Sequence, residues 1–134
     1  MSPQDVLEVR IITGTTLISL KSLVMIRTLN RHSQITLLDN AGIEVFHDLK
    51  WFEMELPKQI FFRCHKSYIV NCNYFESINL SACKIRLKNG CEIPLSRRRK
   101  QELLDCIKEC IIWKDYVEGL KFVTNSTTSG LNIP

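Results

Sequence analysis

Short alternations of apolar and polar residues dominate the first half of the chain. Four segments of strand length carry this pattern: VLEVRII (6–12), TTLISL (15–20), LVMIRTL (23–29) and QITLLD (34–39). Turn residues, including Gly14 and Asn30, separate them. A period of two residues is typical of strands that bury one face. The pattern therefore predicts mostly antiparallel β-structure for the N-terminal half.

A short helix is predicted next, over residues 49–56 (LKWFEMEL), whose apolar residues recur at helical spacing. Asp48 is placed to cap the first amides of this helix, and Pro57 blocks its continuation. Two further strands are expected near 60–70 and 74–79.

The following segment, CKIRLKNGCEIPLS, predicts a hairpin whose register can be tested against its apolar residues. A two-residue Asn-Gly turn would place Leu87 opposite Glu92. A three-residue loop over 88–90 places Leu87 opposite Cys91 and keeps the apolar residues on one face. We therefore expect the longer loop, with Gly90 in the left-handed conformation that it requires.

Helical spacing returns in SRRRKQELLDCIKECIIW, which predicts a helix over about 97–113 with Ser96 as its N-cap. Its first turn holds four consecutive cations, Arg97 to Lys100. A cation at a helix N-terminus is unfavourable by roughly 0.3 to 1 kcal/mol. Guanidinium groups beside the unsatisfied amides of a helix start indicate an anion site.

Positive charge is concentrated in one part of the chain. Residues 61–100 hold nine Lys/Arg and two Asp/Glu, a local charge of +7, which leaves −3 for the rest of a chain whose total is +4. In the predicted hairpin, Lys84 and Arg86 point away from the apolar face and form a short basic strip. This polarity favours a polyanion partner, nucleic acid before an acidic membrane. A solvated charged surface is the plainer alternative.

No run of apolar residues approaches the roughly 18 to 20 that cross a membrane. The start, MSPQDVLEVR, lacks the order of a signal peptide, so we expect a cytoplasmic protein that makes no membrane contact. The six cysteines are interpreted as buried thiols, and the absence of a C-x-x-C pair argues against a metal site. Cys64 and His65 are neighbours on a predicted strand, so they point to opposite faces and cannot act as nucleophile and base. We expect no enzyme activity and no cofactor.

Four motifs together carry a family resemblance: VMIRTLNRHSQITLLDN (24–40), LKWFEMEL (49–56), FFRCHKSYIVN (61–71) and IRLKNGCEIPLSRRRK (85–100). In this order they resemble the LytTR DNA-binding domain, found in the output domains of bacterial response regulators and in stand-alone transcription regulators. The resemblance covers roughly residues 7–105. It implies a mainly β, elongated fold of antiparallel strands with one short internal helix and a C-terminal helix.

The resemblance also implies sequence-specific binding of duplex DNA, read through loops set into successive major grooves without a recognition helix. Carried over residue by residue, the base-contacting positions are His32, Lys66 and Arg97. The residues placed to meet the DNA backbone are Arg31, Ser33, Arg63, Ser67, Arg98 and Lys100. Relatives often have Arg or Asn at the position of Lys66.

We expect one domain over residues 1–113 and a C-terminal extension over 114–134 with a flexible end. The expected partner is double-stranded DNA with repeated half-sites. A second copy of the chain on the DNA and an upstream signalling protein are left open as further partners, as is the choice between a stand-alone regulator and an excised domain. The competing function is a β-rich protein-interaction module with a basic surface and no base specificity.

Overall fold

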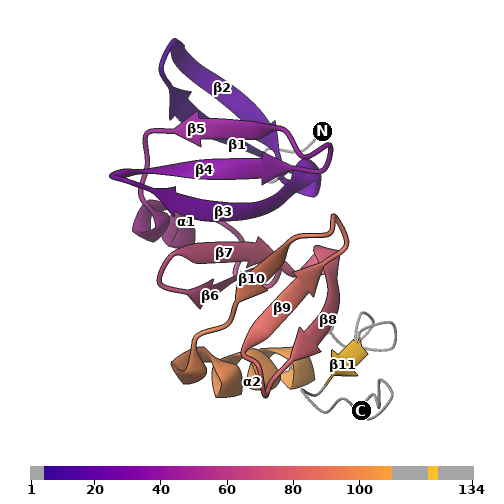
Figure 1. Cartoon of the computed structure of the whole chain (residues 1–134). Coiled ribbons are helices and arrows are strands. Elements are labelled where there is room, and N and C mark those ends of the chain that lie inside the picture. The colour runs from indigo at the N-terminus through magenta and orange to yellow at the C-terminus, as the bar shows by residue number, and fades with distance from the viewer. Residues whose placement is uncertain (1–4, 110–120, 124–134) are drawn as a thin grey trace. The chain divides into compact units, whose positions relative to one another are not determined.

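The computed structural model describes residues 5–109 and 121–123, in which strands predominate (Figure 1). The strands are β1 (Val6–Ile11), β2 (Gly14–Ser19), β3 (Leu23–Leu29), β4 (His32–Leu37), β5 (Gly42–Val45), β6 (Phe61–His65), β7 (Tyr68–Asn71), β8 (Phe75–Asn79), β9 (Lys84–Leu87), β10 (Glu92–Pro94) and β11 (Lys121–Val123). The helices are α1 (Leu49–Glu55) and α2 (Lys100–Glu109). The mainly β fold class, with one short internal helix and a C-terminal helix, is confirmed.

Contacts within the chain divide it into two compact units. The first comprises Met1–Arg63 and Ser67–Asn71, and the second comprises Cys64–Lys66 and Cys72–Pro134. In the described residues the strands form three sheets, with the orders β1-β2, β5-β4-β3-β7-β6 and β10-β9-β8-β11. All of the pairings described are antiparallel except that of β11 with β8.

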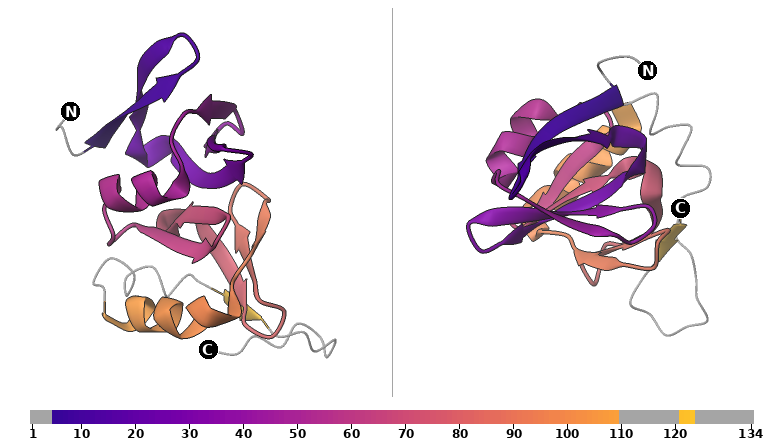
Figure 2. Two further views of the ribbon diagram at one scale, coloured as in Figure 1. Left: turned by 90° about the vertical axis from the view of Figure 1, so that its left-hand side faces the viewer. Right: turned by 90° about the horizontal axis from the view of Figure 1, so that it is seen from above.

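The first unit is built around one apolar core. One face of the β1-β2 sheet, one face of the larger sheet and one side of α1 supply its buried residues, listed as Val9, Ile18, Leu23, Ile26, Ile35, Val45, Leu49, Phe52, Leu56, Phe61 and Ile69. Helix α1 contacts β3 and β7 and can be followed in both views of Figure 2. Burial of these side chains on strands and helix alike is the main force holding the unit together.

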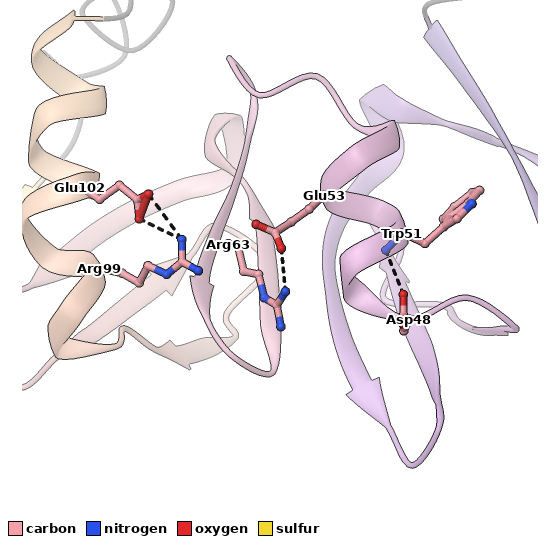
Figure 3. A network of polar contacts seen from close by, with 6 residues as sticks. All are labelled: Asp48, Trp51, Glu53, Arg63, Arg99 and Glu102. Atoms are coloured by element: carbon pink, nitrogen blue, oxygen red, sulfur yellow. Dashed lines mark hydrogen bonds and ion pairs between the residues drawn. The ribbon is translucent and has the colours of Figure 1, made fainter.

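Helix α1 begins and ends where its flanking residues, Asp48 and Pro57, predict. The Asp48 carboxylate accepts a hydrogen bond from the Trp51 N–H over 2.9 Å (Figure 3), which satisfies one of the amides that a helix start leaves unpaired. The helix ends at Glu55, with the extended residue Leu56 before Pro57. The predicted cap and stop are therefore confirmed.

The hairpin of the second unit has the register that its apolar pattern predicted. Ile93 lies opposite Ile85, and the Leu87 N–H donates to the Cys91 carbonyl over 2.8 Å. Gly90 has a φ of 94°, in the left-handed region that this loop requires. Because Ile78 pairs with Ile85 on the other side, a row of buried isoleucines crosses three strands.

Three strand predictions need correction. The strand expected at 34–39 is β4, which begins at His32 because β3 and β4 are joined by a tight turn, and which ends before the exposed Leu38. The strand expected near 60–70 is two strands, since a turn at Lys66 and Ser67 separates β6 from β7. β5 lies outside the predicted strands; it is short and begins with Gly42, a residue type that is depleted in strands.

The C-terminal helix begins later than predicted. Arg97–Arg99 form a 3-10 turn, α2 starts at Lys100, and the Ser96 side chain makes no capping hydrogen bond. The predicted end at residue 113 lies outside the described residues. Within the expected extension, β11 pairs with β8, and the division into one domain over 1–113 and an extension stays a prediction. Among the described residues, no helix is long and apolar enough to cross a membrane.

Candidate nucleic-acid interface

The hairpin between β3 and β4 positions Arg31 and His32. Leu29 lies opposite His32, so the connection is a two-residue turn, and Asn30 takes a left-handed φ of 57°. Asparagine tolerates this conformation better than most residues. Arg31 is exposed at the tip, while the His32 ring lies 4.5 Å from the Phe46 ring, centroid to centroid. The tip thus presents a cation and a half-buried imidazole that packs against Phe46.

Ser33 does not fit the backbone-contacting role expected of it. The side chain is fully buried, and its hydroxyl donates to the His47 carbonyl over 2.7 Å. Successive residues of a strand point to opposite faces, so Ser33 faces the core when His32 faces away from it. A hydroxyl without solvent access cannot meet a phosphate, and we remove Ser33 from the candidate set.

The turn between β6 and β7 carries Lys66 and Ser67. Lys66 is exposed, and Ser67 is half-buried. The Ser67 carbonyl accepts a hydrogen bond from the Thr28 N–H over 2.9 Å. This bond places Ser67 beside the last residues of β3, within the same unit as the β3-β4 hairpin.

A second backbone bond brings together the chain segments that carry Lys66 and Arg97. The Ser96 N–H donates to the Cys64 carbonyl over 2.8 Å, and both residues belong to the second unit. Lys66 follows Cys64 by two residues, and Arg97 follows Ser96 directly. Arg97 and Arg98 are exposed on the 3-10 turn, and Lys100 is half-buried at the start of α2.

Arg99 accounts for part of the crowded charge in this segment. Its Nη1 lies 2.9 Å and 3.4 Å from the two carboxylate oxygens of Glu102, three residues along the chain (Figure 3). This ion pair offsets one of the four cations locally. Arg97 and Arg98 on the 3-10 turn and Lys100 at the start of α2 remain as the candidate DNA-contacting cations of this segment.

Arg63, expected at the DNA backbone, is engaged inside the first unit. Its Nη1 lies 2.6 Å from Glu53 Oε1 on α1 (Figure 3), and its side chain is 21% exposed. The ion pair ties β6 to α1. A phosphate would therefore have to compete with the Glu53 carboxylate for this guanidinium.

The basic strip on β9 has the predicted orientation but is largely neutralised. Lys84 and Arg86 are exposed, whereas Ile85 and Leu87 are buried. Lys84 Nζ lies 3.5 Å from Glu92 Oε1, and Arg86 Nε lies 3.1 Å from Glu76 Oε2. Exposed pairs of this kind contribute little to stability, but they lower the net positive charge of the strip.

The structure gives a role to His47, a residue that the sequence analysis does not single out. His47 Nε2 accepts the Arg10 N–H over 3.1 Å, and the imidazole stacks on Trp51 with ring centroids 3.5 Å apart. Burial, followed by the positive charge of Arg10, lowers the pKa of His47. The four-residue spacing from His47 to Trp51, just before a predicted helix, was the available signal.

The thiols are not arranged for chemistry. Cys64 and Cys72 are buried, as expected, whereas Cys83 and Cys91 are half-buried, and all four are reduced. Burial raises the pKa of Cys64 to about 12. Over the part of the chain that the structure describes, His, Cys, Asp and Glu form no cluster of three or more that could hold a metal ion.

Two other polar side chains flank the β6-β7 turn. Asn71 is buried and donates from Nδ2 to the Leu23 carbonyl over 2.9 Å. His65 is half-buried at the end of β6.

Comparisons with known proteins agree on one family. The sequence model of the LytTr DNA-binding domain matches residues 13–108. Accessory gene regulator protein A from two strains of Staphylococcus epidermidis is 39% identical over 59 residues. That match covers 44% of this chain and 24% of the relatives, so the chain aligns with about a quarter of their length.

A solved structure supports the fold. The LytTr DNA-binding domain of a putative methyl-accepting/DNA response regulator from Bacillus cereus superimposes with a TM-score of 0.67. The alignment covers 77% of this chain and 96% of that domain at 21% identity.

The family match spans the β3-β4 hairpin, the β6-β7 turn and the 3-10 turn before α2, which carry the three expected base-contacting residues. Members of the LytTR family are DNA-binding modules of transcription regulators and are not enzymes. This chain belongs to the LytTR DNA-binding domain family.

Proposed function

We propose that the chain binds duplex DNA sequence-specifically, with His32, Lys66 and Arg97 contacting bases in successive major grooves. Arg97 offers a planar fork that suits the O6 and N7 acceptors of guanine, and Lys66 can donate to the same atoms as a point charge. His32 can donate from its ring. Under this assignment, three separate turns of the chain recognise the DNA sequence.

The observation that carries the proposal is the placement of these side chains. Lys66 and Arg97 are exposed on tight turns. His32 is the first residue of β4 and directly follows the turn of the β3-β4 hairpin. Turns that project from strands can enter a groove while the strands keep the fold. The Ser96 to Cys64 bond supports joint action by Lys66 and Arg97, because it holds their segments together.

For the DNA backbone we propose contacts from Arg31, Ser67, Arg98 and Lys100. Three are cations that can pair with phosphates, and Ser67 can donate a hydroxyl hydrogen bond. Arg63 is included on the condition that a phosphate displaces Glu53. Lys84 and Arg86 are not in the set, because the family resemblance places neither at the DNA and both are paired with carboxylates.

We further propose that the chain is monomeric in solution and occupies two repeated half-sites about one helical turn apart, since a reader of this size covers a short element. Two copies would then lie on the same side of the duplex. Sedimentation analysis with and without a two-site duplex tests this, and stable dimers at nanomolar concentration without DNA would contradict it.

The main test is selection of bound duplexes from a random pool, followed by titration of the selected site and a scrambled site at several salt concentrations. We expect a defined repeat and tighter binding to it. Binding of equal strength to both duplexes would reduce the function to non-specific DNA binding. No binding to any duplex would instead favour a protein-interaction module.

A further inference from the structure

The second face of the five-stranded sheet carries a polar row that the proposed set of DNA contacts does not use. Arg27 lies opposite Gln34 on β4 and opposite Tyr68 on β7, and Gln34 lies opposite Glu44 on β5. Directly opposed residues of a sheet share a face. One row of polar side chains therefore crosses four strands.

This row lies on the same face as His32. Along β4, His32 and Gln34 are two residues apart, and along β3 the same holds for Arg27 and Leu29, the residue opposite His32. With a period of two, all four side chains project to one side. The apolar face is the other one, where Ile26, Ile35 and Ile69 are buried.

Arg27 is oriented by a single side-chain hydrogen bond. Its Nε donates to Gln34 Oε1 over 2.9 Å, and the side chain is half-buried. Among the described residues, this is the only hydrogen bond or ion pair that the Arg27 side chain makes. The two Nη groups keep four N–H donors for a further partner, in the fixed geometry that guanidinium offers to phosphate.

The amide of Gln34 lies close to the neighbouring strand at Gly42. A Cβ at Gly42 would lie 2.6 Å from Gln34 Nε2, so the amide occupies the space that the glycine leaves. Gly42 thus leaves room for the Gln34 amide, whose oxygen accepts the hydrogen bond from Arg27. Gln34 therefore lies between Gly42 on β5 and Arg27 on β3.

We propose that Arg27 is a further DNA-contacting residue that binds a backbone phosphate beside the groove entered by His32, with Gln34 as its positioning residue. The inference rests on the proposed function, in which His32 lies at a base. A phosphate is the expected ligand because the half-buried guanidinium, oriented by the Gln34 amide, can form charge-assisted hydrogen bonds with phosphate oxygens. These bonds are stronger than the bonds between neutral groups. Arg27 would then determine how deeply the β3-β4 hairpin enters the major groove.

The test is salt-dependent titration of the selected duplex with Arg27→Ala, Arg27→Lys and Gln34→Ala in the full chain. Arg27→Ala should weaken specific and scrambled duplexes by a similar factor and lower the slope of log K against log salt by about one unit. Arg27→Lys should retain the slope. Gln34→Ala should weaken binding several-fold with the slope intact, because the charge of Arg27 remains but its guanidinium loses the hydrogen bond that orients it.

Lys50→Ala is the matched control, since Lys50 is an exposed cation on α1. An Arg27→Ala protein with the affinity and slope of Lys50→Ala would overturn the inference. Thermal melts of each variant identify any loss of folding. If Arg27→Ala does not fold, Gln34→Ala decides instead, because wild-type affinity in that variant would overturn the inference. If His32→Ala and Arg97→Ala bind like wild type as well, the proposed function itself fails; if they lose binding and Arg27→Ala does not, only the role of Arg27 is wrong.

Discussion

The hydroxyl of Ser33 donates to the backbone carbonyl of His47 over 2.7 Å, which ties the start of β4 to the segment that leads into α1. On the other face of the hairpin, the His32 ring rests on Phe46, the residue that precedes His47. The segment at 46–47 therefore supports both residues from opposite sides. A change at either position alters the placement of the proposed base-contacting imidazole.

Ser33→Ala should lower the free energy of unfolding by about 1 to 3 kcal/mol, because it leaves a buried carbonyl without its donor. Denaturant unfolding measures this loss. DNA titrations well below the melting temperature should show an unchanged salt slope. A slope reduced by one unit at unchanged stability would restore Ser33 to the backbone-contacting set.

Arg97→Ala should cost roughly 1 to 3 kcal/mol on the selected duplex and remove discrimination at one base pair, if Arg97 contacts guanine. Arg86→Ala is the control, because Arg86 is also exposed in the second unit but is paired with Glu76. Titrations against single-base variants of the site give the discrimination. Equal weakening on all duplexes would demote Arg97 to a backbone contact.

Glu53→Gln tests whether Arg63 is available to DNA. The carboxylate holds the guanidinium at 2.6 Å, so its removal should raise affinity for any duplex and steepen the salt slope. Arg63→Ala should do the reverse. Unchanged affinity in both variants, together with a lower melting temperature, would assign Arg63 to the fold alone.

His47 makes stability depend on pH in a defined direction. Burial and Arg10 lower its pKa from the usual 6.5, so the unfolded chain binds the proton more readily than the folded protein does. The contribution of His47 is therefore present above pH 6.5 and lost as pH falls through its folded-state pKa. Protonation also removes the lone pair that accepts the Arg10 N–H.

The free energy of unfolding of wild type and of His47→Gln, measured between about pH 5 and pH 8, isolates this effect. That range spans the usual pKa of histidine. The glutamine keeps an acceptor but does not titrate there. We expect the variant to have a shallower loss of stability on acidification. Parallel curves for the two proteins would contradict the role of His47.

Cys64 should resist alkylation in the folded protein. A pKa raised to about 12 leaves almost no thiolate at neutral pH, and the side chain has no solvent access. Mass spectrometry after iodoacetamide treatment should find Cys83 and Cys91 labelled before Cys64 and Cys72, since the first two are half-buried and the other two are buried. Early labelling of Cys64 would mean that β6 opens locally.

Much of the fold follows from patterns within short segments. Alternation placed Ile85 and Leu87 on one face and thereby chose the loop of the β9-β10 hairpin, and a single carboxylate, Asp48, marked the start of α1. The same alternation applies to His32 and Ser33, which cannot both face DNA. Ser33 lies on the buried face, although the family resemblance places it at the DNA backbone.

Other features depend on partners distant in the sequence. Nothing near Arg63 indicates that Glu53 on α1 will hold it, and the Cys64 to Ser96 bond joins residues that only the complete sheet arrangement brings together. The 3-10 turn at Arg97–Arg99 likewise replaces the first helical turn that spacing favoured. Such outcomes follow from tertiary structure, which overrides local preference.

The two-residue turn at Lys66 and Ser67 has a consequence for how regulators of this kind diverge. Lys66 is exposed, and the strands on both sides are held by Cys64, Ile69 and Val70, which are buried. Replacement of an exposed turn residue usually changes stability by less than about 0.5 kcal/mol. Under the proposed role of Lys66, the preferred operator can drift through mutation at this position while the scaffold stays constant, so target choice and foldability evolve as separate traits.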